Sequence, residues 1–409
     1  MVNDLIVVGG GAAGFFGAIE TATRNPKKKI IILEKTTKLL SKVGISGGGR
    51  CNVTHHCFEP TPLSRHYPRG QKELKQLFRI FQASDTVRWF EQRGVELITE
   101  EDGRMFPVTE NSQTIIDCFL NTAASAGIEI LTGCEVSKIE KPTDTFLMRS
   151  RNGQNFSSRA ILVAMGGHPQ AKAYEWLQAL GHTIIPPIPS LFTFNDPSKE
   201  FIDLMGVAVQ NAVVKIAGTK YASQGPVLIT HWGLSGPACI RLSSWAARHL
   251  HEVNYHFTTL INWAGGETEE SVRAIFKEKS RLGRKIYSQP LFHLPQRLWE
   301  KLCVKAEIKE KTVWAEATAK SLNRLMEFLI RCPFEIRGKT TFKEEFVTCG
   351  GGDLQEIDLS TMESKKVPGL YFAGEVLDMD GETGGFNFQS AWTTAYIAAS
   401  AIAVSKTEA

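Results

Sequence analysis

Six residues near the N-terminus, Gly9-Gly10-Gly11-Ala12-Ala13-Gly14, constrain the fold more than any other segment of this chain. They follow the apolar run Leu5–Val8, which is typical of a buried strand, and they open the helix-forming stretch 12–24. In that setting the first glycine permits a tight turn, the second lets the backbone approach a pyrophosphate, and the third allows helix and strand to pack closely. The helix N-terminus then faces the phosphates. The segment therefore predicts a dinucleotide-binding strand–turn–helix unit.

An acidic residue at the end of the next apolar run strengthens this interpretation. Glu34 follows Ile30–Leu33 and lies 20 residues beyond Gly14. A carboxylate at that place can accept hydrogen bonds from ribose hydroxyls. FAD and NAD share the fingerprint, so it does not by itself choose between them.

A second Gly-rich element near the C-terminus favours FAD. The run Gly369–Glu375 predicts a strand entering a turn, and Asp380–Gln389 leads into a closing helix. The partial positive charge of a helix N-terminus favours the negative charge that builds on the pyrimidine side of a reduced flavin. No second copy of the nucleotide fingerprint is present in the sequence, and we therefore expect FAD as the bound cofactor.

The chain of 409 residues, with 43% hydrophobic and 22% charged positions, is long enough for two or three domains. We expect an α/β fold: a doubly wound, Rossmann-like FAD-binding domain interrupted by a β-rich plus helical insertion. The first part of the FAD domain covers residues 1–190, and 340–409 complete it. The insertion covers 191–339, β-rich over 191–265 and helical over 266–335, because α/β character resumes only after it. The proline-rich run Pro186–Pro189 marks the first boundary.

Helix ends are predicted from capping residues. Ser84 is expected to cap a helix that runs to Arg93, and Ser112 a helix that ends at Gly127. Ser235 is expected to cap a helix that begins near Pro237. A further helix is predicted from Val313 to Leu329.

Four separate motifs carry a family resemblance along nearly the whole chain. They are Gly9–Gly14 with Glu34-Lys35, Ile45-Ser-Gly-Gly-Gly-Arg-Cys-Asn-Val-Thr54, Thr230-His-Trp-Gly-Leu-Ser-Gly-Pro237, and Gly374–Gln389. With these motifs the chain resembles the BaiN/RdsA-type bacterial FAD-dependent NAD(P)H oxidoreductase family. The resemblance implies the interrupted FAD domain described above, and it implies that the Ser46–Asn52 stretch lies beside the flavin.

The fingerprint and the resemblance together define the expected site. The predicted cofactor-binding residues are Gly9, Gly11, Ala12, Ala13, Gly14, Glu34, Lys35, Ser46, Gly47, Gly48, Gly49, Arg50, Cys51, Asn52, Val136, Ala164, Gly166, Gly374, Glu375, Gly384, Gly385, Phe386, Asn387 and Gln389. The catalytic candidates are Arg50, which offers charge to phosphate or substrate, and His231, which is the only proton carrier in its motif. The structural alternative for Arg50 is an exposed loop cation, and for His231 it is an ordinary core or surface histidine.

The eight cysteines predict free thiols, because they are scattered and form no C-x-x-C pair. Cys51 and Cys57 are separated by five residues, whereas flavin-dependent disulfide reductases have four between their reactive pair, so dithiol chemistry is disfavoured. For Cys51 a buried, unreactive thiol and a more active role both stay open. Adjacent His55 and His56 lack a spaced set of partners, and no metal site is predicted.

Net charge and hydropathy limit the kinds of partner and the cellular location that the sequence predicts. The net charge of +4 is small for this length, but seventeen Lys and Arg residues between Arg273 and Lys343 outnumber the acidic residues there. Such a face can attract phosphates, although solvated helix surfaces are the commoner explanation. No apolar run approaches the roughly 20 residues that span a bilayer, and no signal peptide is apparent, so a cytoplasmic protein is expected.

The expected reaction is hydride transfer through FAD, with NADH or NADPH as a transient donor and a conjugated C=C bond as acceptor. The assignment of NADH or NADPH as donor rests on the family resemblance. The same resemblance allows either a small-molecule acceptor or a uracil in ribosomal RNA. Oxidation of a small amine and a non-catalytic flavin- or RNA-binding scaffold are the alternatives. The sequence does not predict the oligomeric state.

Overall fold

The computed structural model describes residues 2–281, 283–340 and 347–405. The chain divides into two compact units. Unit 1 comprises Met1–Pro189 and Lys343–Ala409, and unit 2 comprises Ser190–Phe342.

Unit 1 is built on a mostly parallel sheet. Its parallel strands are β1 (Asn3–Val8), β2 (Ile30–Leu33), β6 (Glu129–Leu131), β9 (Asn155–Val163) and β21 (Leu370–Phe372), and the antiparallel strands β19 (Ile357–Asp358) and β20 (Glu363–Ser364) extend one edge. The order is β19-β20-β21-β9-β1-β2-β6. Val8, Leu33, Val163 and Phe372 lie in register, so the strands of both chain halves end at one edge. In an open α/β sheet, ligands bind at this carboxyl edge.

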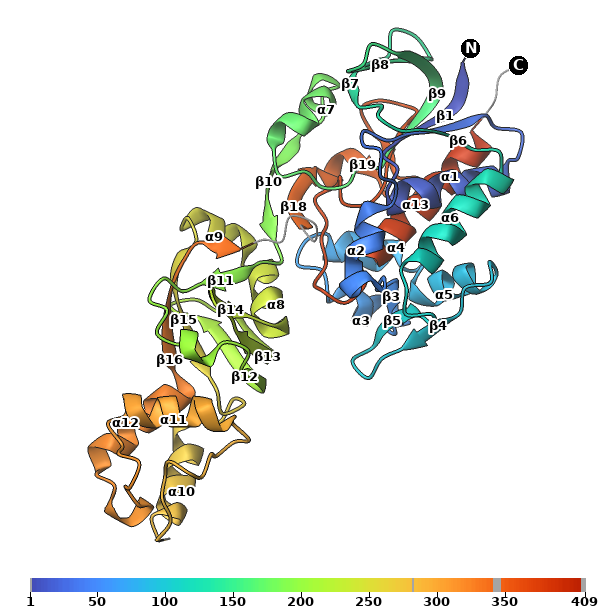
Figure 1. Ribbon diagram of the computed structural model, residues 1–409. Coiled ribbons are helices and arrows are strands. Elements are labelled where there is room, and N and C mark those ends of the chain that lie inside the picture. The colour runs from blue at the N-terminus through green and yellow to red at the C-terminus, as the bar shows by residue number, and fades with distance from the viewer. Residues whose placement is uncertain (1, 282, 341–346, 406–409) are drawn as a thin grey trace. The chain divides into compact units, whose positions relative to one another are not determined.

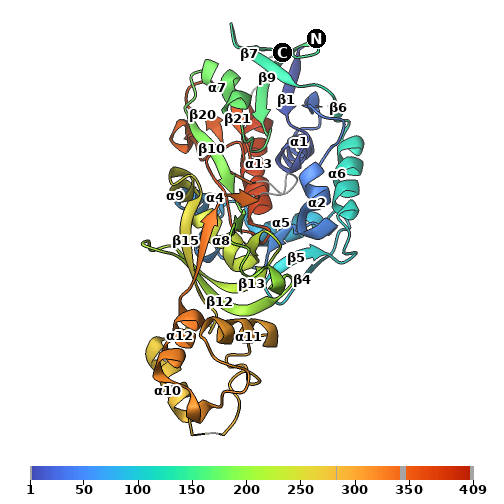
Figure 2. The same cartoon turned by 60° about the vertical axis from the view of Figure 1, so that its left-hand side comes forward.

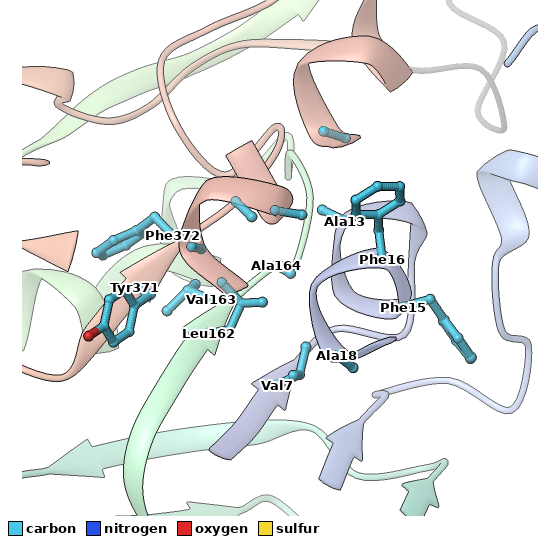
Figure 3. Close-up of a cluster of buried hydrophobic side chains, with 14 of the residues drawn as sticks. Val7, Ala13, Phe15, Phe16, Ala18, Leu162, Val163, Ala164, Tyr371 and Phe372 are labelled. Carbon is cyan, nitrogen blue, oxygen red and sulfur yellow. The ribbon is translucent and has the colours of Figure 1, made fainter. Parts of the chain in front are cut away.

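Three helices cover one face of this sheet: α1 (Ala12–Arg24), α6 (Gln113–Ser125) and α13 (Phe386–Val404). Helices α1 and α13 lie side by side although nearly the whole chain separates them (Figure 1). Figure 3 shows Ala18 of α1 near Val7 of the sheet, whereas the Phe15 and Phe16 rings point away from the sheet strands, and all three α1 residues are fully buried. Phe16 contacts Trp392 of α13 with ring centroids 5.4 Å apart, and Phe15 contacts Phe119 of α6 at 6.2 Å. Burying each large side chain contributes about 1.5–3 kcal/mol, so this layer joins the two halves of the unit into one core.

The remaining parts of unit 1 are smaller. A ribbon of β7 (Val136–Glu140) and β8 (Phe146–Ser150) runs antiparallel onto β9, as the alternating sequence there predicts. A second sheet contains β3 (Thr54–His55), β4 (Leu97–Thr99) and β5 (Arg104–Pro107), and β10 (Ile184–Ser190) pairs with β18 (Val347–Gly352). The short helices are α2 (Ser41–Gly49), α3 (Pro60–Ser64), α4 (Gln71–Leu77), α5 (Ala83–Glu91) and α7 (Glu175–Ala179). The proline-rich run Pro186–Pro189, which was predicted to mark a domain boundary, lies within strand β10.

Unit 2 contains an antiparallel sheet with the strand order β16-β15-β12-β13-β14-β11-β17. The bounds are β11 (Thr193–Asn195), β12 (Ala208–Ile216), β13 (Ala222–Ile229), β14 (Gly233–Ser235), β15 (His256–Asn262), β16 (Cys332–Arg337) and β17 (Lys339–Thr340). Helix α8 (Pro237–Trp245) packs on this sheet, followed by α9 (Ala247–Glu252).

The helical part of unit 2 contains α10 (Glu269–Lys279), α11 (Gln296–Lys305) and α12 (Ala319–Ile330), gathered beyond one end of the sheet (Figure 2). Trp299 and Trp314 fill its core. Helical structure ends at Ile330, and 332–335, which were expected to be helical, belong to β16. This strand pairs with β15 about 70 residues earlier, a long-range contact that overrides local pattern.

Several predicted helix caps are wrong, although α6 and α8 begin where the sequence predicts. Helix α5 begins after Gln82, whose N–H donates to the Asp85 carboxylate at 2.8 Å, and not after Ser84. The Ser112 hydroxyl donates to the Gly44 carbonyl instead of capping α6. Ser235 ends β14, and Gly236 precedes α8. The helix predicted from Val313 begins only at Ala319, where the Thr318 side chain accepts from the Ser321 N–H.

Over the described ranges, no helix combines the length and the apolar character needed to cross a membrane.

Candidate functional site

The Gly9–Gly14 turn has the tight geometry that its sequence predicts. Gly9 has φ +118°, and a Cβ atom there would lie 2.4 Å from the Ala164 carbonyl oxygen. At Gly14 a Cβ would lie 1.9 Å from the Gly9 oxygen, so helix and turn touch. Gly11 precedes α1 without a side-chain cap, and a Cβ there would meet nothing within 4 Å. Open space therefore lies before the first N–H groups of α1.

Glu34 stands at the edge of this turn. Its Oε2 accepts a hydrogen bond from the Gly10 N–H at 2.8 Å, and its Oε1 accepts from the Thr36 N–H at 2.8 Å. The Glu34 carbonyl accepts from the Cys134 N–H, which brings the approach to β7 and the buried Val136 to the same region. Lys35 is exposed. The carboxylate is thus fixed in orientation and keeps further acceptor capacity.

The loop at the end of α2 requires its three glycines. Gly47, Gly48 and Gly49 have φ values of +59°, +70° and +85°, a left-handed run that side-chain-bearing residues disfavour. A Cβ at Gly48 or Gly49 would meet nothing within 4 Å, so their backbone borders open space. The start of α2, which leads to this loop, is held to the nucleotide-binding turn because the Leu40 N–H donates to the Gly10 carbonyl at 2.9 Å.

Arg50, one of the two catalytic candidates, is held by its neighbours. Its guanidinium lies 4.1 Å from the Phe106 ring centroid and 2.7 Å from Glu100 Oε1. Glu110 lies 3.7 Å away, and about 30% of the side chain is exposed. The charge of Arg50 is therefore already balanced by carboxylates, and a substrate anion would have to compete with them.

Cys51 and Asn52 connect this loop to the C-terminal element. With its amide oriented to satisfy both contacts, Asn52 accepts from the Gly385 N–H at 2.9 Å and donates to the Thr54 carbonyl at 3.0 Å. The Cys51 Sγ is fully buried, and this burial raises its pKa to about 12. The thiol of Cys51 is accordingly protonated at neutral pH.

We expect Cys51 to resist alkylation in the native protein, because its side chain is buried and only a minute fraction is thiolate at pH 8. Iodoacetamide labelling, read by mass spectrometry, should be on the order of 100-fold slower at Cys51 in native protein than in urea. Cys57, which is half-buried, provides the comparison within the same chain. Equal rates at Cys51 with and without urea would show that the thiol is accessible.

The N-terminus of α13, like that of α1, lacks a side-chain cap. Gly384 and Gly385 have φ values of +131° and +88°, and a Cβ at Gly385 would lie 2.5 Å from the Thr54 carbonyl oxygen. At Gly374, with φ +76°, a Cβ would lie 3.1 Å from Ala13 Cβ, so this turn touches the start of α1. The N-terminal and C-terminal motifs thus meet within unit 1.

Several predicted residues use their side chains within the protein. Gln389 is fully buried and accepts from the hydroxyls of Thr54 and Thr86 at 2.6 and 2.9 Å. The Asn387 amide bonds to the backbone of Gly381. Glu375 pairs with Lys42 at 2.6 Å and accepts from the Thr348 N–H at 2.7 Å. These side chains hold the loops in place, which leaves backbone groups as the means of contacting a cofactor.

A cluster that the sequence did not reveal surrounds Phe386. Its buried ring stacks on His66 with centroids 4.2 Å apart and on His55 at 4.6 Å. His66 Nδ1 lies 3.2 Å from Glu382 Oε2, and His55 Nδ1 lies 3.1 Å from the Gly384 oxygen. Burial lowers the pKa of His55. Glu382 stood within the Gly-rich motif, but no local pattern signalled His66, since only the fold brings it there.

His231 lies on unit 2, exposed in the turn between β13 and β14, with its ring 4.2 Å from that of Trp232. Its catalytic role stays a prediction. Among residues 2–281, 283–340 and 347–405, no group of three or more His, Cys, Asp or Glu side chains is arranged to hold a metal ion.

Known proteins similar to this chain cover nearly its whole length. A family model described as the HI0933-like protein Rossmann domain matches residues 3–401. A ribosomal RNA dihydrouridine synthase of Haemophilus influenzae is 30% identical over 98% of each chain, and one of Escherichia coli is 27% identical over the same shares. A 3-dehydro-bile acid delta(4,6)-reductase of Clostridium scindens is 24% identical over 98% of this chain and 99% of its own.

Solved structures share the fold. A 3-ketosteroid-delta4-(5alpha)-dehydrogenase of Rhodococcus jostii superposes with a TM-score of 0.52 at 13% identity, over 98% of this chain and 96% of its own. A 3-ketosteroid delta1-dehydrogenase of Sterolibacterium denitrificans gives 0.52 at 12% identity, over 99% and 100%. The predicted fold class and family resemblance are confirmed, and the chain belongs to the HI0933-like Rossmann family of flavoprotein oxidoreductases.

Proposed function

We propose that this chain binds FAD in unit 1 and, with NADH or NADPH as donor, reduces the conjugated C=C bond of a uracil in ribosomal RNA. One observation carries the cofactor assignment: the uncapped N-termini of α1 and α13 lie in the same unit, linked where Gly374 meets Ala13. Two such helix starts provide backbone donors for the phosphate and the flavin ends of one long cofactor.

The residues of unit 1 fit the parts of FAD. The open space before Gly11 suits a pyrophosphate, and the fixed carboxylate of Glu34 suits ribose hydroxyls. The open backbone at Gly48, Gly49 and Gly166 allows close approach, because no protein atom fills the place of a Cβ. Val136, Ala164 and the other predicted residues are proposed to complete the binding surface, and the polar side chains among them mainly position the loops.

When bound, FAD supplies a ring that takes a hydride from one partner and passes it to another. The first N–H groups of α13 are proposed to stabilise negative charge at one end of that ring. His66, oriented by Glu382, offers a proton carrier beside the same helix start. Arg50 and His231 remain candidates for substrate contact.

The acceptor is proposed from chemistry common to the relatives. Two of them are named for dihydrouridine formation in ribosomal RNA and one for reduction of a bile acid. In uracil, as in a steroid enone, the double bond is conjugated to a carbonyl, so hydride adds at one carbon and a proton at its neighbour. NAD(P)H, a proton and uracil give NAD(P)+ and dihydrouracil, which balances two electrons. Several basic side chains of unit 2 form no ion pair within the described part of the chain, and their positive charge favours RNA.

An anaerobic absorbance spectrum tests this proposal. The purified protein with FAD should show a flavin band that bleaches on addition of NADH or NADPH and recovers when ribosomal RNA lacking dihydrouridine is added. A 3-keto-4-ene steroid serves as the competing acceptor, and a small amine without nicotinamide tests for oxidase chemistry. Recovery with the steroid alone would replace the RNA substrate. A spectrum without flavin after addition of FAD would overturn the cofactor assignment, and a flavin that stays oxidised would favour a scaffold.

A further inference from the structure

Two groups of basic side chains in the helical part of unit 2 differ in their partners. In the first group each base contacts a carboxylate. Glu269 lies 2.8 Å from Arg273 and 3.1 Å from Arg331. The remaining pairs of this group are Lys301 with Asp203, Lys305 with Glu200, and Arg324 with Glu307. These five bases are neutralised within the unit.

The second group, here named the basic cluster, consists of Lys277, Lys279, Arg281, Arg284, Lys285, Lys309 and Lys311. None of the seven forms an ion pair with a carboxylate among the residues that the structure describes. Six are exposed and Lys279 is half-buried. Only Glu278 and Glu310 interrupt these basic stretches of the chain, so positive charge accumulates there.

Backbone contacts bring the separate stretches together. The Ile286 N–H donates to the Thr312 carbonyl at 3.1 Å, and the Trp314 N–H donates to the Arg284 carbonyl at 3.0 Å. Lys285 pairs with Val313 as an isolated bridge. Residues 284–286 and 309–314 are thus adjacent, and 277–281 form the end of α10 and its exit. In both whole-chain views α10 lies farther from the sheet of unit 2 than α11 does (Figures 1 and 2).

We propose that the basic cluster binds the phosphate backbone of the RNA substrate. This inference rests on the proposed function and names the surface that such a substrate would require. Like charges held close together without acidic partners repel one another, so the arrangement disfavours the free protein and favours a polyanion. A small steroid offers no series of phosphates to pair with seven cations. An RNA backbone presents a phosphate at every nucleotide and releases counterions when it binds.

A variant with four neutralised bases tests the surface. In Lys277→Gln/Arg281→Gln/Arg284→Gln/Lys285→Gln, we expect the slope of log affinity against log salt to fall by up to about 3, because each phosphate contact contributes roughly 0.7–0.9. Affinity for a ribosomal RNA fragment at 50 mM salt should fall on the order of 100-fold. Filter binding or fluorescence anisotropy between 50 and 200 mM salt measures both quantities.

The matched control removes the same charge elsewhere. Lys72→Gln/Arg79→Gln/Lys215→Gln/Lys220→Gln neutralises four exposed bases that are dispersed over both units. Its salt slope should change by less than about 1. Equal losses in the two variants, or an unchanged slope in the first, would overturn the inference. If the quadruple variant fails to fold by circular dichroism, Lys309→Gln/Lys311→Gln tests the same surface, with a slope change of about 1.5 expected and no change counting against it.

The flavin spectrum of the unmodified protein separates the two proposals. A protein that binds flavin and bleaches with NAD(P)H, yet shows no salt-dependent RNA binding, would contradict the basic cluster alone. A protein that lacks flavin after reconstitution would contradict the proposed function, whatever its RNA affinity.

Discussion

Replacing Gly11 with valine is expected to abolish FAD binding while changing the stability of the protein little. Gly11 has φ −96° and ψ −168°, an extended conformation that valine adopts readily, and a Cβ there meets no protein atom within 4 Å. Loss of glycine at this N-cap costs up to about 1 kcal/mol. The branched side chain would occupy the space proposed for the pyrophosphate. Hydrogen bonds to charged groups contribute about 1.5–3 kcal/mol each, so losing two or more lowers affinity at least roughly 100-fold.

Gly14→Val is the matched comparison, and in this variant the fold itself should be lost together with FAD binding. A Cβ there would lie 1.9 Å from the Gly9 oxygen and 3.3 Å from Val7 Cγ1, so the helix must move away from the strand. We expect this variant to lose its cooperative unfolding transition. Urea unfolding of the two apoproteins and FAD titration by fluorescence quenching measure both properties. Wild-type FAD affinity in Gly11→Val would show that the pyrophosphate lies elsewhere.

The sequence was informative where function depends on local backbone geometry. The Gly9–Gly14 turn, the strands beside it and the helix after it were predictable because each conformational demand falls on a residue type visible in the sequence. The left-handed run at Gly47–Gly49 belongs to the same class. Helix caps were less predictable: Ser112 and Ser235 are suitable caps by composition, but a tertiary contact engages the Ser112 hydroxyl and strand pairing engages Ser235.

Contacts between distant segments were beyond the reach of sequence patterns. The C-terminal motif was correctly noted as a Gly-rich helix start, yet the burial of Gln389 against Thr54 and Thr86 follows only from the packing of α13 on β3 and α5. The stacking of Phe386 on His66 and His55 has the same origin. Likewise, composition gave an excess of basic residues in the insertion, but only the structure separates Lys301 and its paired group from the basic cluster.

A buried ion pair before α13 gives the second large effect. Asp380 is fully buried and Arg69 is 9% exposed, and Arg69 Nε lies 2.5 Å from Asp380 Oδ1. We expect Asp380→Ala to lower the free energy of unfolding by about 3–5 kcal/mol, because it leaves a buried guanidinium without its principal counter-charge. Gly381 follows directly and is held by Asn387, so the loop that leads to the α13 N-terminus loses an anchor and FAD affinity should fall as well.

Two further variants separate the buried charge from the loss of a side chain. Lys138→Ala removes one partner of an exposed pair with Glu140 in the same unit and should change the free energy of unfolding by less than about 1 kcal/mol. Arg69→Met/Asp380→Leu removes both charges and should recover part of the lost stability, since apolar side chains of similar size can replace a buried pair at little cost. Urea unfolding followed by circular dichroism gives all three values. A double variant less stable than Asp380→Ala would mean that the other contacts of Arg69 and Asp380, and not the uncompensated charge, hold this loop against α13.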